Sequence, residues 1–351
     1  MKFTLLGAGG WGANWTNLLM SDAEIDLVAV ADRNPEVLKR LADRGLDTSR
    51  LFADSDDALD VPSDAVIVSV PNPARVPLLL RIVSEGRHLL VDKPLVHTTG
   101  DLNALLTAGL HRKSVCMVAQ NYRLFAGIQM VKNDLQSGRI GPIDTVQVQF
   151  LKHTEHRPEY FVGNLPGILP LGVEMCIHHF DLMRYLLNAE PIRVTARGWR
   201  QPWSYGVGWT SMDAHVEFPD GVCVSYASAW NKPRNATCWP GRWDICGRDG
   251  SICYGEKGRS VEFFDSSARS VFHDPGPEVV PDSQASMAAV YRDFKASVNR
   301  VNSGSSPFET GFHTLEDNAR SLALALAVGE SAETGCQVEM AEFTARHGLS
   351  F

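Results

Sequence analysis

The chain of 351 residues lacks the features that assign a protein to a membrane, disulfide-rich or nucleic-acid-binding class. It has no apolar run of about 18 residues, which a membrane-spanning helix would need. Its seven cysteines are scattered and include no C-x-x-C pair, so neither a disulfide framework nor a zinc knuckle is indicated. Only 33 basic residues stand against 41 acidic ones, without a long basic run, and no nucleic-acid partner is expected.

Other absences narrow the class further. The start, MKFTLLGAGGWG, is too short in its apolar part and too rich in glycine for a secretory signal. We therefore expect a cytoplasmic protein with no membrane partner. The chain contains no internal repeat and no low-complexity tract. A hydrophobic fraction of 44% and a charged fraction of 21% are ordinary for globular proteins, and the length suffices for two domains.

The first part of the chain alternates short apolar segments with helical patterns. Near-continuous apolar runs of this kind suit strands that are covered on both faces, as in a parallel sheet. Their alternation with helices predicts a doubly wound α/β domain of the Rossmann type over residues 1–122. The expected strands are residues 3–6, 27–31, 65–70, 88–91 and 115–119.

The second part has a different pattern, in which apolar and polar residues alternate with a period of two. This period indicates a mostly antiparallel sheet with one face in water. We predict a second domain over residues 123–351, an α+β domain with a large open sheet. Helices expected at 287–301 and 313–332 can pack back on the first domain. The expected strands include residues 145–153, 192–199, 211–218 and 222–230.

A glycine-rich turn, GAGGWG at residues 7–12, follows the first expected strand and opens a helix. The G-x-G-x-x-G spacing permits a tight turn and a close approach of the backbone to a pyrophosphate, which would lie on N–H groups at the helix N-terminus. Asp32 ends the second strand, where an acid can accept hydrogen bonds from a ribose diol and repel a 2′-phosphate. The pattern favours NAD over NADP, although Arg33 can stack on adenine or soften that preference.

A lysine between an acid and a proline, Asp92-Lys93-Pro94, lies just beyond another apolar strand. Ligands bind at the carboxyl ends of the strands in a doubly wound sheet. Pro94 restricts Lys93 to extended geometry and so fixes its direction. A single lysine is more often a solvated surface residue. In this place, however, its ammonium can hydrogen-bond a reacting hydroxyl and hold it near nicotinamide C4.

Several motifs follow one another in a recognisable order. They are the glycine turn, Asp32, VSVPNPAR at 68–75, DKP at 92–94, QNYR at 120–123 and an acid-x-x-x-His helix. This combination resembles the Gfo/Idh/MocA oxidoreductase family, which includes glucose–fructose oxidoreductase and inositol dehydrogenase, and it covers essentially the whole chain. The resemblance implies that the second domain binds a polyol or sugar substrate and mediates assembly into a homodimer or homotetramer.

The resemblance also implies roles for single residues. Lys93 matches the family lysine beside the nicotinamide, and His178 matches the histidine that acts as general acid/base on the substrate hydroxyl. Glu174 stands where an aspartate is usual and is implied to hold the substrate or the lysine. The chain departs from the family at Asp92, where glutamate is usual. A second departure is Arg75, where histidine is frequent, and it is expected to alter the cofactor contacts.

The predicted site therefore has three overlapping groups of residues. The catalytic residues are Lys93, His178 and Glu174. The cofactor-binding residues are Gly7, Gly9, Gly10, Trp11, Gly12, Asp32, Arg33, Pro71, Asn72, Lys93 and Gln120. The substrate-binding residues are Lys93, Tyr122, Arg123, His153, His156, Arg157, Tyr160, Glu174 and His178.

The stretch GVEMCIHHFDLMRYLL, residues 172–187, has the apolar character of a buried helix. With 3.6 residues per turn, its positions Glu174, His178, Asp181 and Tyr185 would share one face. His178 would then lie beside two carboxylates, which can orient its ring and tune its basicity.

The neighbouring histidine, His179, falls on an apolar stripe of the same helix, and we expect it to be a satisfied core residue. The imidazole and carboxylates of the polar face are also chemically able to bind a metal ion. Hydride transfer to a nicotinamide needs only a proton acceptor, however, and Lys93 would repel a cation. No metal is therefore expected.

The segment KHTEHRPEY at 152–160 carries a second group of polar side chains. One interpretation is an ordinary solvated loop. The other is a substrate lid in which His153, His156 and Arg157 supply hydrogen bonds and Tyr160 supplies an aromatic face for a polyol.

The leading hypothesis is an NAD-dependent oxidoreductase that moves a hydride between nicotinamide C4 and a secondary alcohol or ketone of a sugar, cyclitol or derivative. His178 would act as general acid/base and Lys93 would polarise the oxygen. Two alternatives from the same resemblance stay open at this point. One is transient oxidation by a retained NAD that drives glycoside cleavage or epimerisation, and the other is a non-catalytic NAD-binding sensor.

Overall fold

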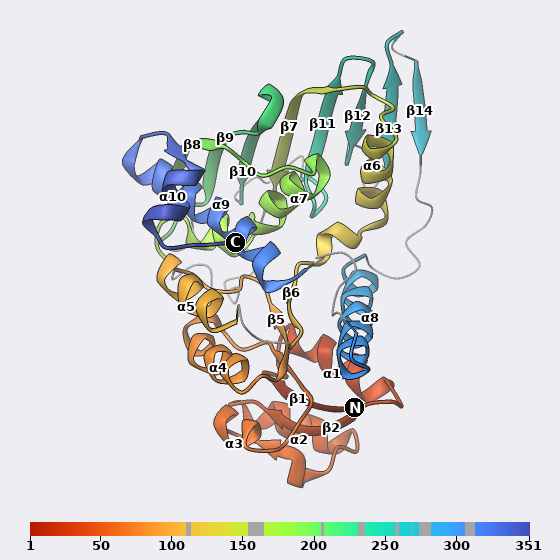
Figure 1. Cartoon of the computed structure of the whole chain (residues 1–351), viewed down its shortest axis with the longest axis vertical. Helices are drawn as coiled ribbons and strands as arrows, with labels where there is room; N and C mark the ends of the chain where they lie inside the picture. Colours follow the sequence, from red (N-terminus) through yellow and green to blue (C-terminus); the bar gives the residue numbers. More distant parts are fainter. Residues whose placement is uncertain are drawn as a thin grey trace. The chain divides into compact units, whose positions relative to one another are not determined.

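The chain folds into two compact units (Figure 1). The first unit consists of Met1–Gln120, Met287–Ala319 and Phe351, and the second consists of Asn121–Ser286 and Arg320–Ser350. The computed structural model describes residues 1–109, 114–153, 165–204, 207–230, 236–256, 260–267, 269–273, 282–305 and 313–351.

A six-stranded sheet with only parallel neighbours forms the centre of the first unit. Its order is β3-β2-β1-β4-β5-β6, so the chain reverses direction across the sheet between β1 and β4. This arrangement confirms the predicted doubly wound fold. The strands are β1 (Lys2–Leu6), β2 (Asp26–Ala31), β3 (Leu51–Phe52), β4 (Ala65–Val68), β5 (His88–Asp92) and β6 (Cys116–Ala119).

Helices cover both faces of this sheet, which explains why its strands are apolar throughout. Every residue of β4 and β5 is buried. Figure 1 shows α4 and α5 on one side of the sheet and α1 and α8 on the other. The α8 side is closed by aromatic contacts, since the Phe3 ring of β1 lies 6.4 Å from Tyr291 and 6.1 Å from Phe294. The helices are α1 (Gly12–Ser21), α2 (Pro35–Asp43), α3 (Ser55–Leu59), α4 (Asn72–Ser84), α5 (Thr99–Gly109) and α8 (Asp282–Asn302).

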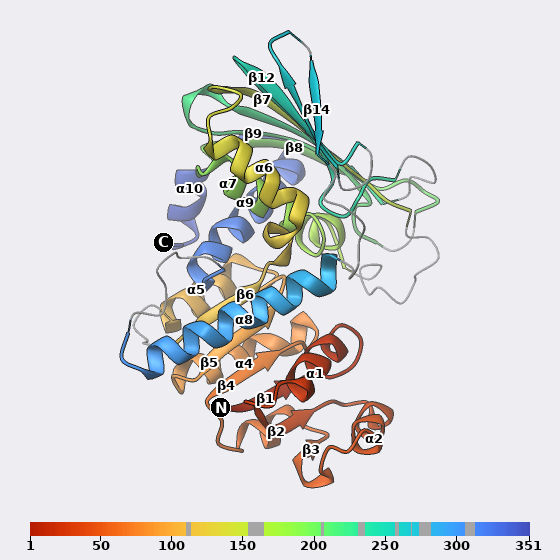
Figure 2. The same cartoon turned by 90° about the vertical axis from the view of Figure 1, so that its right-hand side faces the viewer.

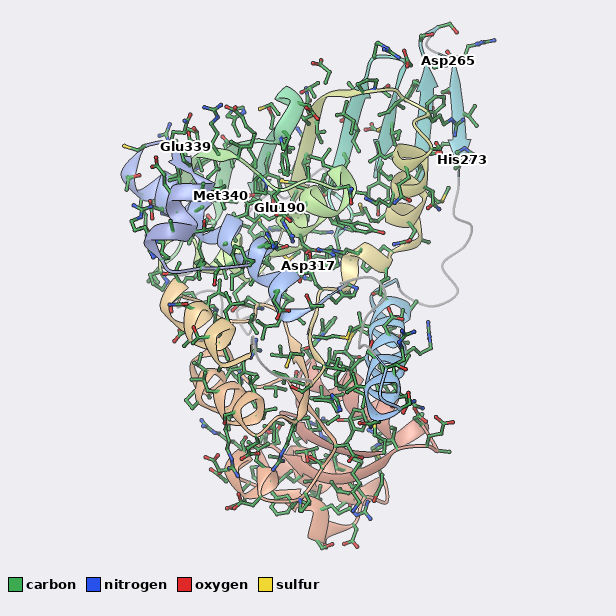
Figure 3. All side chains as sticks on the ribbon, in the orientation of Figure 1. Glu190, Asp265, His273, Asp317, Glu339 and Met340 are labelled. Atoms are coloured by element: carbon green, nitrogen blue, oxygen red, sulfur yellow. The ribbon has the colours of Figure 1, made fainter. Side chains whose placement is uncertain are left out.

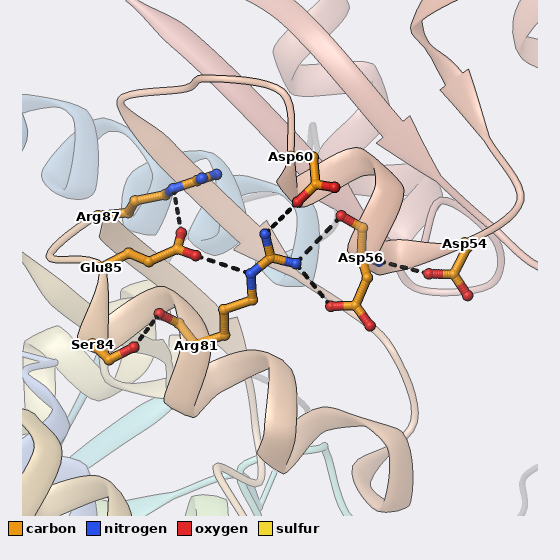
Figure 4. A network of polar contacts seen from close by, with 7 residues as sticks. All are labelled: Asp54, Asp56, Asp60, Arg81, Ser84, Glu85 and Arg87. Atoms are coloured by element: carbon orange, nitrogen blue, oxygen red, sulfur yellow. Dashed lines mark hydrogen bonds and ion pairs between the residues drawn. The ribbon is translucent and has the colours of Figure 1, made fainter.

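An ion-pair network joins α3 to α4 on the surface of the first unit (Figure 4). The Arg81 guanidinium donates to Asp56 at 2.9 Å, to Asp60 at 2.5 Å and to Glu85 at 2.9 Å. Both aspartates are mostly exposed, so each pair contributes less than about 1 kcal/mol, and the contribution falls as salt is added. The network therefore tethers the short helix α3 to the last turn of α4.

The second unit contains a nine-stranded sheet in the order β14-β13-β12-β11-β7-β10-β9-β8-β15. All neighbouring strands in it are antiparallel except the parallel pair β7 and β10, which confirms the predicted, mostly antiparallel sheet. The strands are β7 (Ile143–Leu151), β8 (Arg193–Trp199), β9 (Ser211–Glu217), β10 (Cys223–Ala229), β11 (Arg242–Gly247), β12 (Gly250–Tyr254), β13 (Val261–Asp265), β14 (Ser270–His273) and β15 (Val338–Glu339).

The two faces of this sheet differ as the period-two pattern predicts. On β7, Val146, Val148 and Phe150 are buried, whereas Gln147 and Gln149 between them are exposed. Figure 2 shows α6, α7 and α9 against one face, and no described helix covers the other. These helices are α6 (Ala126–Gln136), α7 (Ile177–Leu187) and α9 (Leu315–Thr334), and α10 (Met340–Arg346) follows β15.

β14 is the last strand at one end of the sheet and ends at His273 (Figure 3). The Asp265 carboxylate closes the preceding turn by accepting hydrogen bonds from the backbone N–H groups of Ser267 at 2.9 Å and Arg269 at 3.0 Å.

The oligomeric state stays a prediction. None of the helices in the described ranges is long and apolar enough to cross a membrane.

Candidate functional site

The glycine-rich turn lies between β1 and α1, where the strand order reverses. Gly7 has φ = +84°, and a Cβ atom there would lie 2.8 Å from the Ser69 carbonyl group at the end of β4. A Cβ atom on Gly12 would lie 2.0 Å from the Gly7 carbonyl oxygen. Both positions therefore require glycine, because the turn is pressed against the loop that follows β4.

The start of α1 is suited to an anion. The helix has no side-chain N-cap and no acidic residue in its first turn, so its positive end is not compensated locally. Gly10, with φ = +50°, has open space around the position of a Cβ atom, and the Trp11 side chain is 49% exposed. These features fit the pyrophosphate of a dinucleotide.

Asp32 follows β2 and lies directly beside the turn. One of its carboxylate oxygens accepts the N–H groups of Ala8 at 2.9 Å and Gly9 at 2.8 Å, and the other accepts the N–H of Asn34 at 2.9 Å. The acid predicted to bind the ribose is therefore anchored to the phosphate-binding turn itself. Arg33 next to it is exposed.

The acid before the candidate lysine is directed into the first unit. The buried Asp92 carboxylate accepts the Trp15 indole N–H at 2.9 Å and the Ser69 hydroxyl. Burial raises the pKa of Asp92, while the Ser69 hydrogen bond and the Arg75 charge lower it. Lys93, one residue on, is only partly buried. The side chain of Asp92 is therefore structural, whereas that of Lys93 retains access to solvent.

The remaining predicted cofactor residues of the first unit lie at the ends of β4 and β6. Pro71 precedes α4, and the buried Asn72 donates its side-chain N–H to the Pro94 carbonyl at 3.2 Å. Gln120 follows β6 and is also buried. Their contact with a cofactor stays a prediction.

The helix expected over residues 172–187 is not one α-helix, and this part of the prediction is wrong. Leu169–Val173 form a π-helix, α7 begins only at Ile177, and Glu174 lies in the turn between them. The N–H of Glu174 bonds to the Leu169 carbonyl at 2.9 Å, five residues back. Each π-type turn contains an extra residue, so the helical phase counted along α7 does not extend to Glu174.

The second carboxylate of the expected polar face, that of Asp181, is hydrogen-bonded within the protein. Asp181 is buried and accepts two hydrogen bonds from Arg123, from Nε at 2.7 Å and from Nη2 at 2.5 Å, and a third from the Ser321 hydroxyl at 2.8 Å. Arg123 is buried as well. The pair therefore anchors α7 within the second unit. Contact of Arg123 with a substrate stays a prediction.

An aromatic ring packs face to face on the imidazole of His178. The rings of His178 and Tyr122 are stacked, with centroids 3.8 Å apart and planes inclined by 6°. Burial raises the pKa of Tyr122, so its phenol stays neutral, and His178 itself is 4% exposed. The stack fixes the plane of the imidazole and leaves its ring nitrogens at the edge, which suits a group that must move a proton along one direction.

His179 is the satisfied core residue that was predicted. It is fully buried, with Nδ1 2.8 Å from the Tyr226 hydroxyl and Nε2 2.9 Å from the Trp239 carbonyl oxygen. A carbonyl can only accept, so Nε2 carries the proton and Nδ1 accepts from Tyr226. The two adjacent histidines are thus both buried but have different partners: His178 is stacked on Tyr122, and His179 is hydrogen-bonded to Tyr226 and to the Trp239 carbonyl.

The burial of His179 predicts a pH dependence of stability. Burial lowers the pKa of His179 to about 4, whereas the unfolded chain takes up the proton near 6.5. The unfolded state therefore binds more protons as the pH falls, and stability is lost between about pH 6.5 and pH 4. We expect this residue to reduce the free energy of unfolding by about 2 kcal/mol between pH 7 and pH 5.

The measurement is urea unfolding of the native chain and of His179→Gln at both pH values. The amide can replace both hydrogen bonds but does not titrate, so the variant should lose about 2 kcal/mol less than the native chain over this interval. Equal losses in the two proteins would contradict the assignment of a neutral, buried His179.

Only one of the four predicted lid residues lies in the part of the chain that the structure describes. His153 follows β7 and is partly buried. His156, Arg157 and Tyr160 lie outside the described residues, and their roles stay predictions. Among the described residues, no group of three or more histidine, cysteine, aspartate or glutamate side chains could hold a metal ion.

Sequence reasoning missed three residues that donate hydrogen bonds to the buried carboxylates: Trp15, Ser69 and Ser321. The first two hold Asp92, and the third holds Asp181. Ser69 directly follows β4, so its place after a buried strand was a usable signal. Trp15 and Ser321 lie within helices, far from their partners in the chain, and no local pattern indicates them.

In comparisons with known proteins, two family models together match most of this chain. Residues 1–120 match the family model described as an oxidoreductase family with an NAD-binding Rossmann fold, and residues 128–253 match the GFO/IDH/MocA C-terminal domain. Inositol 2-dehydrogenase of Rhizobium meliloti is 29% identical over 196 residues, and the match covers 56% of this chain and 58% of that protein. The scyllo-inositol 2-dehydrogenase (NAD(+)) of Bacillus subtilis is 24% identical over 347 residues, covering 97% and 96%.

Solved structures show the same fold over nearly the whole chain. An oxidoreductase from Agrobacterium radiobacter, in complex with NAD+, L-tartaric acid and magnesium, aligns with a TM-score of 0.85 at 20% identity and covers 97% of this chain and 99% of its own. Levoglucosan dehydrogenase in complex with NADH and levoglucosan aligns with a TM-score of 0.79 at 20% identity, covering 97% and 98%. At these identities the likeness shows the fold.

Proposed function

Because the chain belongs to the Gfo/Idh/MocA family of oxidoreductases, with its NAD-binding Rossmann fold, we propose that it oxidises a secondary alcohol of a sugar, cyclitol or derivative, or reduces the corresponding ketone. NAD as the predicted cofactor is confirmed by the family match. When bound, NAD supplies nicotinamide C4, which exchanges the hydride. The proposal beyond this class concerns the substrate and the residues that act on it.

The binding of the dinucleotide is assigned to the turn of residues 7–12 and to Asp32. Glycine is required at two positions of this turn, and the uncapped start of α1 can accept the pyrophosphate. The Asp32 carboxylate, anchored on the turn, would accept the ribose hydroxyls and disfavour a 2′-phosphate. These two features support NAD over NADP.

We assign the transfer of the substrate hydroxyl proton to His178. Oxidation of an alcohol requires a base that accepts the hydroxyl proton as the hydride leaves, and reduction requires the same group as an acid. The imidazole is suited to both directions, and the stack on Tyr122 holds its plane fixed. This stacked, nearly buried histidine is the observation that carries the proposal.

We assign to Lys93 the stabilisation of charge on the reacting oxygen of the substrate. An ammonium group stabilises negative charge that develops on the oxygen in the transition state. Lys93 extends from the carboxyl end of β5, where an open α/β sheet binds its ligands, and it is not fully buried. Glu174 is proposed to orient the substrate hydroxyls, although it does so from the turn before α7 and not from the helix.

The test is a panel of cyclitols and sugars, including myo-inositol, scyllo-inositol, levoglucosan and glucose, with NAD and with NADP. We expect at least one polyol to give stoichiometric formation of NADH, with NAD preferred over NADP. Substrate conversion without net change in nicotinamide absorbance would favour transient oxidation with a retained cofactor. Tight NAD binding without conversion of any compound would favour a sensor, and either result would overturn the proposal.

A further inference from the structure

Arg75, one of the residues at which the sequence departs from the family pattern, occupies a buried position in the first turn of α4. Its side chain leaves 5% of its surface exposed. Nε and Nη2 donate to the Val70 carbonyl at 3.0 Å and 2.8 Å, Nη1 donates to the Asp92 carbonyl at 2.7 Å, and Nη1 also donates to the Pro94 carbonyl. The guanidinium thus joins the end of β4 to the segment that follows β5.

The two carbonyl groups bound by Nη1 stand at the two ends of the Lys93-Pro94 backbone. The Asp92 carbonyl belongs to the peptide group directly before Lys93, and the Pro94 carbonyl belongs to the peptide group that follows Pro94. Holding both carbonyls on one nitrogen restrains the Lys93-Pro94 segment from its two ends, and with it the direction in which the lysine side chain leaves the backbone. Asn72 supplies a second donor to the Pro94 carbonyl at 3.2 Å. The backbone around the lysine is therefore held from α4, not only by the sheet.

Of the three consecutive residues Asp92, Lys93 and Pro94, the lysine is the least buried. The Asp92 carboxylate is turned inward to Trp15 and Ser69, and Pro94 is buried. Lys93 is the one of the three consecutive residues whose side chain is partly accessible. The Asp92 carboxylate and the carbonyls of Asp92 and Pro94 are thus bonded within the protein, and Lys93 is the residue of the three that solvent partly reaches.

We propose that Arg75 is the positioning residue for Lys93, and that it acts through the backbone carbonyls of Asp92 and Pro94 without touching substrate or cofactor. A planar guanidinium has five donors in a fixed fork and can serve three carbonyls at once, which an ammonium group or an imidazole cannot do with the same geometry. The inference rests on the proposed role of Lys93 in the reaction. It assigns Arg75 a different task from the altered cofactor contacts expected of it from the sequence.

The proposal predicts a loss in turnover with little change in cofactor binding. Displacing a catalytic group by about 1 Å costs up to about 100-fold in rate, so Arg75→Met should lower kcat about 10- to 100-fold. The Kd for NADH should change less than about threefold. Arg75→Lys keeps the charge but not the fork, and it should recover only part of the rate. Arg184→Lys, which alters a buried arginine of the second unit bonded to Glu190 and Ser321, is the matched control.

A double-mutant cycle separates positioning of the lysine from general damage. If Arg75 acts through Lys93, then Arg75→Met should cost less than about threefold when it is added to Lys93→Met, because the group it positions is gone. Rate losses that multiply fully in the double variant would overturn the inference. So would a rate for Arg75→Lys equal to that of the native chain. Where Arg75→Met does not fold, as judged by NADH binding, the same cycle is run with Arg75→Lys.

Failure of the proposed function gives a different result. Normal turnover by Lys93→Met would remove the lysine from the mechanism, whatever the Arg75 variants do. A slow Lys93→Met enzyme together with an Arg75→Lys enzyme that has native kcat would leave the proposed function intact and overturn only the positioning role.

Discussion

Replacement of His178 by asparagine is expected to lower kcat/KM for alcohol oxidation about 10²- to 10⁴-fold, the range that general acid–base catalysis contributes. Asparagine retains hydrogen bonding but cannot accept the proton of the substrate hydroxyl. In the native enzyme, the rate of oxidation should rise with pH as His178 loses its proton, because only the neutral imidazole can act as a base. The variant should lose this inflection while the Kd for NADH stays unchanged.

The matched control for this substitution is His215→Asn. His215 is exposed on β9 of the same unit and has its ring 3.3 Å from the Ser225 hydroxyl, so it tests the effect of removing a histidine in general. The control should retain native turnover and the native pH profile. If His178→Asn turned over within about threefold of the native rate, or kept the same inflection, His178 could not be the acid/base group.

Replacement of Lys93 by methionine should lower kcat about 10²- to 10³-fold, the typical cost of removing one donor that stabilises charge on a reacting oxygen. Methionine keeps most of the length and apolar volume of the side chain while it removes the charge. The effect should fall on kcat more than on KM, because the ammonium is needed most where negative charge develops, in the transition state. Steady-state kinetics with the best substrate of the panel measures this division.

Lys39→Met serves as the control for the loss of a positive charge in the first unit. Lys39 is exposed on α2, away from the strand ends. Its substitution should leave kcat and KM unchanged. A Lys93→Met variant with native kcat and a raised KM would mean that the lysine binds the substrate and the transition state equally well. That result would contradict its role on the reacting oxygen.

The architecture was largely predictable because burial leaves a strong pattern in the residues. Strands covered on both faces, such as β4 and β5, are apolar without interruption, and the half-exposed β7 alternates Val146, Val148 and Phe150 with glutamines. The glycine turn was equally readable, since Gly7 and Gly12 occupy places where no Cβ atom fits. Two-residue strands such as β3 carry too little pattern and were not predicted.

The site was less predictable because its geometry depends on contacts between distant residues. Counting helical turns placed Glu174 and Asp181 on the same helix face as His178. A π-helix precedes Glu174, however, so the count does not hold for this residue. The Asp181 carboxylate accepts hydrogen bonds from Arg123 and Ser321. The partner that the structure assigns to the imidazole is Tyr122, which is far away in the chain. A helical wheel contains neither a change of helix type nor a partner from another element.

The order and chemistry of the residues determined the family, the two kinds of sheet, the dinucleotide turn and the identity of the candidate acid/base and lysine. These properties follow from local backbone requirements and from the period of burial, both of which are written along the chain. The tertiary structure decided how Lys93 and His178 are held: the first between carbonyls fixed by Arg75, the second against the ring of Tyr122. Such contacts arise only when separate elements pack together, so no local pattern of residues specifies them.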